Sequence, residues 1–406
     1  MATTTNAKDA PRKDKQTAPI PEKPGESERQ TRQKDNGPVK TIDQKAEVKK
    51  PARPVKRKTP NPTPRFAISP QALKRLTLVV VAYSHVEREF FPTEEAYHAE
   101  KEVEERAAQV LEVMEQLGVP GQLNPANEYF LSNLMIDRPN LVLNLVDTLR
   151  GKDVLQTSVP AALELIDIPY TGADMRGLVI GNDRNLFKQI LQASDIPTPD
   201  YQFIQRSGTK VNPDLGLPLI VKLNESGGSV GIDNKAVKET LEEAQNRVNE
   251  LISTYHIPVI VERFIDGPEI TAVVFEDSRR RHVFLGQKIF SSSPDGKHEF
   301  TSLESYEDAN SYHYGPVQDQ ELVKKIEQYV NKAFRVLHNK DYSKYDIRVD
   351  QNTMTPYFTD CNPNTAFGPH KGLPFTEVLE TLYGVKFEKV LAALLSKYAK
   401  KIKTHS

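Results

Sequence analysis

Short apolar runs that alternate with amphipathic segments constrain the fold of this chain more than any other feature. Leu76–Ala82 and Asn140–Val146 have the length and continuous apolar character of strands buried on both faces of a parallel sheet. Between them, Thr93–Leu117 carries the apolar spacing of one long amphipathic helix that ends at Gly118. This alternation predicts an α/β fold with an open parallel sheet in its N-terminal part.

The same pattern predicts the elements that follow. A strand and turn are expected at Ile168–Gly172, and later strands at Leu217–Leu223, Ile257–Phe264, Ile270–Phe275, His282–Phe290, Tyr345–Val349 and Pro356–Asp360. Helices are expected at Val154–Leu165, Arg184–Ala193, Ala236–Tyr255, Gln320–Leu337 and Phe375–Ile402, the last interrupted near Gly384. With 406 residues, the chain is long enough for two or three packed units.

Residues 1–65 differ in composition from the rest and are called the basic arm below. The arm holds 17 Lys and Arg against 8 Asp and Glu, ten prolines and no aromatic residue. Such a segment cannot bury enough apolar surface to offset its ordering entropy, so we expect it to be disordered. It is interpreted as a solubilising tail, or as a segment whose Lys49–Lys58 run contacts an acidic partner or a membrane surface or acts as a nuclear signal.

Charge and composition exclude several classes of protein. The remaining residues hold 37 Lys and Arg against 47 Asp and Glu, so we expect no nucleic acid to bind the folded body. The chain has one cysteine, Cys361, which excludes an intramolecular disulfide and a cysteine-based zinc site and fits a reducing, cytoplasmic location. We expect no transmembrane segment, because no apolar run reaches the roughly 18 residues needed to span a bilayer.

A glycine- and serine-rich loop follows one of the predicted strands. Lys222 stands near the end of the strand, and the loop Ser226–Gly231 follows it. Backbone N–H groups in such a loop can contact phosphate oxygens while the ammonium group supplies a positive charge. The spacing matches neither a P-loop nor a dinucleotide fingerprint, so an ordinary flexible turn is the alternative for the loop taken alone.

Two glutamates flank the turn between the next two predicted strands. Glu262 ends one strand and Glu269 begins the other, so both carboxylates can face one crevice. A carboxylate accepts hydrogen bonds from an adenine amino group or from both ribose hydroxyls more strongly than a neutral side chain does. Two solvated turn glutamates are the alternative.

Polar side chains end the last two predicted strands. Asp350 ends one strand, and Asp360 and Asn362 end the other on a shared face with Cys361 turned away. Two carboxylates and one amide oxygen form an all-oxygen set that suits Mg²⁺ bridged by phosphates. Arg348 shares the face of Asp350, where a guanidinium can stabilise a transferring phosphoryl group or an oxyanion. A polar cluster satisfied by salt bridges is the alternative.

These features, in this order, resemble the D-alanine–D-alanine ligase branch of the ATP-grasp superfamily. The resemblance extends over about residues 137–385 and includes the Leu163–Gly172 segment. It implies an ATP-grasp fold of the α/β class, in which two α+β subdomains sandwich ATP. By this resemblance the basic arm (1–65) precedes an N-terminal α/β substrate domain (66–181), a central subdomain (182–270) and a C-terminal subdomain with the metal and catalytic residues (271–406).

The resemblance also implies how ATP is bound. Lys188 and Lys222 would hold the phosphates, beneath a loop formed by Ser226, Gly227, Gly228 and Ser229. Ser229 would in addition take part in catalysis. The adenine amino group would meet Glu262, with Arg263, Phe264 and Ile265 as the hinge beside the base, and Glu269 would bind the ribose.

The remaining roles that the resemblance implies concern the metal and the joined substrates. Asp350, Asp360 and Asn362 would hold two Mg²⁺ ions, with Mn²⁺ as the alternative metal. Arg348 would stabilise the acyl-transfer intermediate. Lys371 and Gly372 would bind the carboxylate of the second substrate.

The substrate loops depart from the family pattern. Tyr83–Glu89 has no glycine where the family has a glycine-rich loop with a glutamate, and Gly228 replaces the first loop serine. Further departures are a reduced loop at Val146–Gln156, an aspartate instead of a glutamate at Asp360, a rearranged turn at Asn364–Lys371, and a faint flexible loop at Phe300–Tyr306, for which Lys297 or Tyr306 would substitute. Amino-acid chemistry is expected, and the identity and stereochemistry of the joined substrates, D-alanine included, are left open.

Together these features predict an ATP- and Mg²⁺-dependent ligase that joins a carboxylate to an amine through an acyl phosphate. The expected partners are a small-molecule acid and amine, amino acids by the resemblance, and a homodimer is left open. One alternative is an ATP-grasp ligase of another branch with different acid and amine pairs. Another is a non-catalytic ATP-binding scaffold recruited through the basic arm, although a scaffold has no need for the full set of Lys, Glu, Asp and Asn residues.

Overall fold

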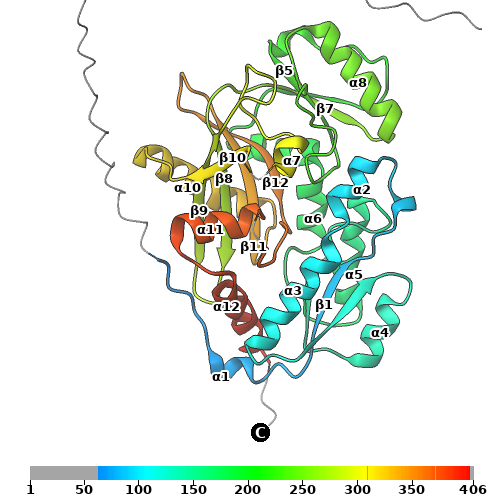
Figure 1. The fold of residues 1–406 in the computed structure, drawn as a ribbon, viewed down its shortest axis with the longest axis vertical. Coiled ribbons are helices and arrows are strands. Elements are labelled where there is room, and N and C mark those ends of the chain that lie inside the picture. The colour runs from blue at the N-terminus through cyan, green and yellow to red at the C-terminus, as the bar shows by residue number, and fades with distance from the viewer. Residues whose placement is uncertain (1–62, 309, 371, 403–406) are drawn as a thin grey trace, which may run out of the picture. The chain divides into compact units, whose positions relative to one another are not determined.

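The computed structural model describes residues 63–308, 310–370 and 372–402. These residues form three β-sheets with helices packed around them (Figure 1). The first sheet is parallel with the strand order β2-β1-β3, and its strands are β1 (Val79–Ser84), β2 (Gly121–Ala126) and β3 (Leu141–Leu145). Every residue of β1 and β3 is buried, as their continuous apolar runs predict. The expected parallel sheet near the N-terminus is therefore confirmed.

Helices cover both faces of this sheet. They are α3 (Val103–Gln116), α4 (Phe130–Asp137) and α5 (Ser158–Leu165), which follows the 3₁₀ turn η2 (Asp153–Thr157). The same part of the chain also contains α2 (Glu94–Glu100) and α6 (Met175–Asn182). The apolar residues of α3 pack in one core with those of β1, β3 and the C-terminal helix α12 (Phe387–Ala399), and the red helix lies beside α3 in Figure 1. The apolar residues of α4 and α5 pack in another core with the remaining residues of the sheet.

The predicted single helix Thr93–Leu117 is wrong, because the chain turns at Lys101 and Glu102 and forms two helices. The physical reason is burial: α3 has a buried apolar face, whereas α2 buries no residue. The predicted strand at Ile168–Gly172 reduces to one bridge between Val142 and Tyr170. The apolar pattern also does not indicate β2, because its GQLNPA sequence has no apolar run.

The second sheet is antiparallel with the order β4-β7-β5-β6. Its strands are β4 (Tyr201–Ile204), β5 (Leu219–Leu223), β6 (Val237–Lys238) and β7 (Val259–Arg263). Helix α8 (Leu241–Tyr255) packs its apolar face on this sheet. The helix begins later than predicted, because Thr240 caps it in a capping box with Glu243 and the preceding residues pair in β6.

The third sheet is also antiparallel, with the order β10-β9-β8-β11-β12. Its strands are β8 (Glu269–Glu276), β9 (Arg281–Phe290), β10 (Tyr312–Gly315), β11 (Tyr342–Val349) and β12 (Pro356–Asn362). Helices α7 (Arg184–Ala193) and α10 (Gln320–Val336) share a core with one set of its side chains, and α11 (Pro374–Tyr383) and α12 share another. Gly384, at φ +63°, ends α11 where the sequence predicts an interruption.

The remaining described elements are short: α1 (Pro70–Leu73), the 3₁₀ turns η1 (Arg88–Phe90) and η3 (Pro213–Leu215), and α9 (Leu303–Glu307). None of the helices in the described ranges combines the length and the apolar character that a bilayer crossing requires. The basic arm lies outside the described residues except for positions 63–65. The domain boundaries at residues 181 and 270 stay predictions.

Candidate active site

One cavity of about 680 Å³ collects most of the polar residues that the sequence indicates. Its walls come from the loop after β5, the turn between β7 and β8, strands β11 and β12, and the junction of α2 and α3. This volume falls within the range of small-molecule sites, which is roughly 300–1,000 Å³. Every sheet of the described chain contributes to the site, either directly or through the loops that leave it.

Glu262 lies at one end of the cavity between two lysines. The Glu262 carboxylate is buried, with Oε1 3.3 Å from Lys188 Nζ and Oε2 3.4 Å from Lys222 Nζ. Burial by itself would raise the pKa of Glu262, but the charges of Lys188 and Lys222 outweigh burial and lower it. The carboxylate is therefore held ionised at the cavity wall, where it can accept a hydrogen bond.

Lys188 does not line the cavity, in contrast to its predicted place at the ATP phosphates. Its side chain is fully buried behind Glu262 and donates to Thr198 Oγ1 at 2.9 Å. Burial lowers the pKa of Lys188 to about 8, against the opposing charge of Glu262. Lys188 thus lies against Glu262, and Lys222 is the lysine of this pair that lines the cavity; the predicted role of Lys188 at the phosphates stays a prediction.

Glu269 lies beside the turn between β7 and β8 and is fully engaged. Its Oε1 accepts from Lys288 Nζ at 2.8 Å and from Thr301 Oγ1 at 2.6 Å, and its Oε2 accepts from Arg348 Nη1 at 3.1 Å. Burial opposes ionisation, but the Lys288 and Arg348 charges outweigh it and lower the pKa of Glu269 to about 2. The structure thus brings Glu262 and Glu269 to the same cavity, as the sequence predicts.

Arg348 belongs to the hinge and not to a phosphate pocket. Its Nε donates to Ile265 O at 2.6 Å and its Nη2 donates to Gly267 O at 2.9 Å, while its guanidinium lies 4.4 Å from the ring centre of Phe264. With Glu269 as the third partner, all three nitrogens of the group are used. Arg348 therefore holds the hinge backbone in place, and its predicted role at the reacting centre stays a prediction.

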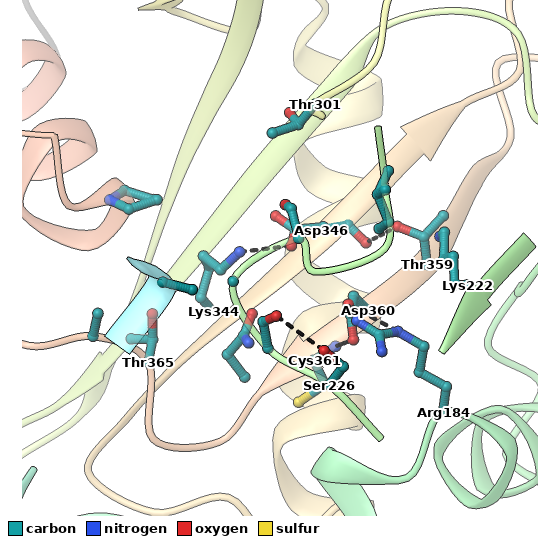
Figure 2. A pocket seen from close by; sticks show the side chains of 18 of the residues that line it. Arg184, Lys222, Ser226, Thr301, Lys344, Asp346, Thr359, Asp360, Cys361 and Thr365 are labelled. Carbon is teal, nitrogen blue, oxygen red and sulfur yellow. Dashed lines mark hydrogen bonds and ion pairs between the residues drawn. The ribbon is translucent and has the colours of Figure 1, made fainter. Parts of the chain in front are cut away.

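The ends of β11 and β12 bring together a lysine, two aspartates and an asparagine, as Figure 2 shows for three of them. Asp346 pairs with Asp360 across the two strands, and Lys344 pairs with Asn362. Lys344 Nζ donates to Asp346 Oδ2 at 2.6 Å. Asp346 Oδ1 and Asn362 Oδ1 are buried and accept no hydrogen bond from the described residues, so both oxygens are available to a ligand.

Asp350 does not belong to this group, which corrects its predicted place among the metal ligands. It follows the last residue of β11, and its carboxylate accepts from the backbone N–H groups of Asn352 and Thr353 in the turn to β12. It does not line the cavity, whereas Asp346 does. Lys344 and Asp346 were not predicted as site residues, although the alternation along Lys344–Asp350 places all four polar side chains on one strand face.

Asp360 is held by an arginine that the sequence analysis also missed. Arg184, at the start of α7, donates from Nε to Asp360 Oδ2 at 3.1 Å and from Nη1 to Leu223 O at 2.8 Å. The next residue along the strand, Cys361, points to the opposite face. It is buried in the core, and its Sγ accepts a hydrogen bond from Asn339 Nδ2. The expected alternation of Asp360, Cys361 and Asn362 is therefore observed.

The glycine- and serine-rich loop rests against helix α2 and the start of η2. Gly227 N donates to Asp153 Oδ2 at 2.7 Å, and Gly231 N donates to Glu95 Oε1 at 2.8 Å. Gly228 has φ +60°, and a Cβ there would lie 3.0 Å from the Cβ of Ala99. This crowding gives a physical reason for glycine where the resembling family has a serine. Ser226 and Ser229 also line the cavity.

Some predicted substrate residues lie elsewhere. Tyr83–Glu89 does not line the cavity, because Ser84 Oγ accepts from the backbone N–H groups of Asp147 and Thr148. Gly372 is likewise absent from the cavity wall, and Lys297 pairs with Glu239 on the surface at 2.7 Å. Lys371 and the side chain of Tyr306 lie outside the described residues.

Residues 190–396, about half of the chain, match the family model described as D-ala D-ala ligase C-terminus. The D-alanine–D-alanine ligase of Paracidovorax citrulli is 26% identical over 61% of this chain and 72% of that protein. The enzyme of Delftia acidovorans is 27% identical over 62% of this chain and 74% of that protein.

Solved structures share the fold. A D-alanine–D-alanine ligase of Bacillus anthracis complexed with ATP has a TM-score of 0.60 and 18% identity, and the match covers 80% of this chain and 98% of that chain. D-alanyl-alanine synthetase A of Vibrio cholerae has a TM-score of 0.62 and 16% identity over 80% of this chain and 99% of that chain. The ATP-grasp fold predicted from the sequence is therefore confirmed.

Proposed function

The chain belongs to the D-alanine–D-alanine ligase family, and from this premise we propose that it uses ATP to join the carboxylate of one amino acid to the amine of another. The observation that carries this proposal is the cavity in which Lys222, Glu262 and Glu269 meet Asp346, Asp360 and Asn362. One half of this cavity can hold a nucleotide, and the other half has oxygen atoms for a metal. The arrangement supports ATP-dependent formation of an amide bond.

The nucleotide half is preorganised by the buried charges described above. Glu262 can accept the adenine amino group, because Lys188 and Lys222 keep its carboxylate ionised. The hinge Arg263–Ile265 can flank the base, since Arg348 fixes its backbone. Glu269 can accept a ribose hydroxyl in exchange for the hydrogen bond from Thr301. Lys222 and the N–H groups of the glycine-rich loop supply positive potential for the phosphates.

The residues present fit Mg²⁺. Asp346 Oδ1 and Asn362 Oδ1 are buried oxygens without hydrogen bonds from the described residues, and Asp360 lies beside them. No group of three His, Cys, Asp or Glu suited to a metal occurs within the described ranges, which suits a metal whose other ligands are phosphates and water. When bound, Mg²⁺ would neutralise charge on the phosphates; we propose Asp346, Asp360 and Asn362 as its ligands, with Mn²⁺ as the alternative metal.

The proposed reaction has two steps. A carboxylate oxygen of the first substrate attacks the γ-phosphorus of ATP, and ADP leaves with the bridging oxygen. The amine nitrogen of the second substrate then attacks the carbonyl carbon of the acyl phosphate, phosphate leaves, and the nitrogen loses its proton. Lys344 can replace the predicted Arg348 as the cation beside the transferring group, because it lines the cavity next to Asp346. Closure of the Ser226–Gly231 loop on α2 excludes water from the acyl phosphate.

The proposal also concerns which acid and which amine are joined. The Tyr83–Glu89 loop takes no part in the cavity, so we retain acid and amine pairs other than D-alanine with D-alanine as the alternative. A cytoplasmic location belongs to the proposal because the reaction consumes ATP. We also propose that the chain can form a homodimer and that the basic arm binds an acidic partner.

Phosphate release and product mass test the function together. The full chain is incubated with ATP, Mg²⁺ and pooled amino acids, and the expected result is ADP, phosphate and a product heavier by one residue. Phosphate release should require both an acid and an amine. Binding of an ATP analogue without turnover across a broad panel would instead favour the scaffold alternative.

A further inference from the structure

The cavity wall next to the phosphate loop carries carboxylates that the proposed mechanism does not use. They are Glu100 at the end of α2, Asp147 after β3, and Asp153 in η2. Asp153 accepts from Gly227 N at 2.7 Å, so this wall touches the loop that would cover the phosphates. The attacking carboxylate of the first substrate must lie at the same place, because it reacts with the terminal phosphate.

The charges of this wall do not balance among the described residues. Arg106 donates from Nη2 to Asp147 Oδ2 and forms an ion pair with it. Glu100 and Asp153 have no ion pair in the described part of the chain, and Glu100 Oε2 is buried without any hydrogen-bond partner there. The nearby cations Arg184 and Lys344 are engaged by Asp360 and Asp346. A buried carboxylate oxygen without a partner, such as Glu100 Oε2, is costly, and neither Glu100 nor Asp153 has a cation beside it in an ion pair within the described ranges, so this wall is suited to a cation from outside.

The surroundings of Glu100 and Asp153 also raise the pKa values of both carboxylates. Burial raises the pKa of Glu100 well above its usual range, and the charges of Asp147 and Asp153 add to this effect against Arg106. Burial also raises the pKa of Asp153 to about 6. A bound organic cation would remove this penalty.

We propose that Glu100 and Asp153 bind positively charged groups of the first substrate, and that this substrate is a diamino acid. An amino acid with a single ammonium group would compensate one of the two carboxylates, whereas a diamino acid compensates both. This inference rests on the proposed ligase function and identifies the class of acid it uses. Glu100 is then a residue that determines specificity, supplied by the α2–α3 junction and not by the loop after β1.

Binding of matched amino acids tests the inference independently of turnover. The full chain with Mg²⁺ and a non-hydrolysable ATP analogue is titrated calorimetrically with two pairs that differ only by ammonium against methyl. The pairs are 2,3-diaminopropionate with 2-aminobutyrate, and ornithine with norleucine, each as the racemate. At least one diamino acid should bind about tenfold or more tightly than its methyl partner, as expected for a charge-assisted hydrogen bond.

Two variants locate the preference. Glu100→Gln keeps the size of the side chain and removes its charge, so the ratio of the two affinities should fall toward one. Glu105→Gln on α3 is the matched control, because Glu105 is exposed and does not line the cavity, and the ratio should stay unchanged. Circular dichroism checks that both variants fold.

The inference is overturned if neither diamino acid binds more tightly than its methyl partner, or if Glu100→Gln keeps the preference of the unmodified chain. These outcomes are distinct from failure of the ligase proposal. Phosphate release with any acid and amine supports the ligase function even where the diamino preference is absent. Absence of turnover with every pair, despite selective binding, contradicts the ligase function alone.

Discussion

At the scale of single residues, the assignment of the metal ligands depends on Asp346 and Asp350, which are four positions apart. Both follow the alternation of β11, and Arg348-Val349-Asp350 has the family's motif. Only Asp346 pairs with Asp360 and lines the cavity, while Asp350 caps the turn to β12. Strand register therefore favours Asp346 as the metal ligand, whereas the motif match by itself points to Asp350.

Substitution of these two aspartates should separate the assignments. We expect Asp346→Asn to lower Mg²⁺-dependent turnover by at least about a hundredfold, since even indirect partners of a metal affect activity by about 10–100-fold. Asp350→Asn should leave turnover within a few-fold, because it loses only hydrogen bonds in an exposed turn. Steady-state phosphate release over a Mg²⁺ titration measures both. The reverse order of effects would restore Asp350 as the ligand.

The low pKa of Glu269 makes the stability of the fold depend on pH. Its pKa of about 2 lies below the ordinary 4.5, so its stabilisation is complete above about pH 4.5 and disappears as the pH falls toward 2. The full effect corresponds to about 3 kcal/mol. Glu269→Gln is destabilising at neutral pH because Lys288 and Arg348 remain buried without their carboxylate.

Chemical denaturation at two pH values checks this prediction. The difference in unfolding free energy between the unmodified chain and Glu269→Gln should shrink by about 2 kcal/mol between pH 7 and pH 3. Other carboxylates titrate in both proteins and cancel in the difference. A difference that does not change with pH would contradict the assignment of the low pKa to Glu269.

At the scale of elements, helix α2 connects the phosphate loop to helix α8. Glu95 is the connection: its Oε1 accepts from Gly231 N at 2.8 Å and its Oε2 accepts from Tyr255 OH at 3.1 Å. Ala99, one turn later, lies over Gly228. The helix buries no apolar residue, so these contacts with the loop give it a function that its amphipathic pattern does not indicate.

Removal of this connection should uncouple ATP hydrolysis from ligation. In Glu95→Ala, the Ser226–Gly231 loop loses a partner and closes less completely, so water reaches the acyl phosphate. We expect the ratio of phosphate released to amide formed to rise from about one to several. Tyr255→Phe, which removes only the second hydrogen bond, should raise the ratio less. An unchanged ratio with reduced overall stability would assign Glu95 a structural role only.

At the scale of the whole molecule, the described residues that line the cavity all lie between His98 and Pro374. The basic arm has a net charge of about +9, which is opposite to that of the folded body. We therefore expect that the reaction does not require the arm, and that an acidic partner would bind the arm and not the folded body.

Deletion of residues 1–62 should therefore leave kcat and KM for ATP within about twofold of the full chain, within the range of a change remote from the site. Retention on an anionic matrix at low salt should decrease, because the deletion removes most of the excess Lys and Arg. Neutralising Lys49, Lys50, Lys56 and Lys58 in the full chain is the matched comparison. A large loss of kcat on deletion would show that the arm participates in the site.

The sequence by itself determined the α/β class, most of the strands, and the chemical types gathered at the site. Continuous apolar runs require burial on both faces, which is why β1 and β3 were predictable. Lys222, Glu262, Glu269, Asp360 and Asn362 were also predictable, because each stands at or near a strand end that opens into one cavity. β2 and the break between α2 and α3 were not, since neither has a distinctive apolar pattern.

Tertiary structure alone decided which side chains meet. A period of two along β11 assigns Lys344, Asp346, Arg348 and Asp350 to one face but does not give their distance from Asp360, which depends on register and on the length of the turn to β12. Burial of Lys188 behind Glu262, the hinge contacts of Arg348, and the approach of Glu100 and Asp153 to the phosphate loop likewise join residues far apart in the chain. Local sequence cannot encode such distances, because they arise only when separate sheets pack around one cavity.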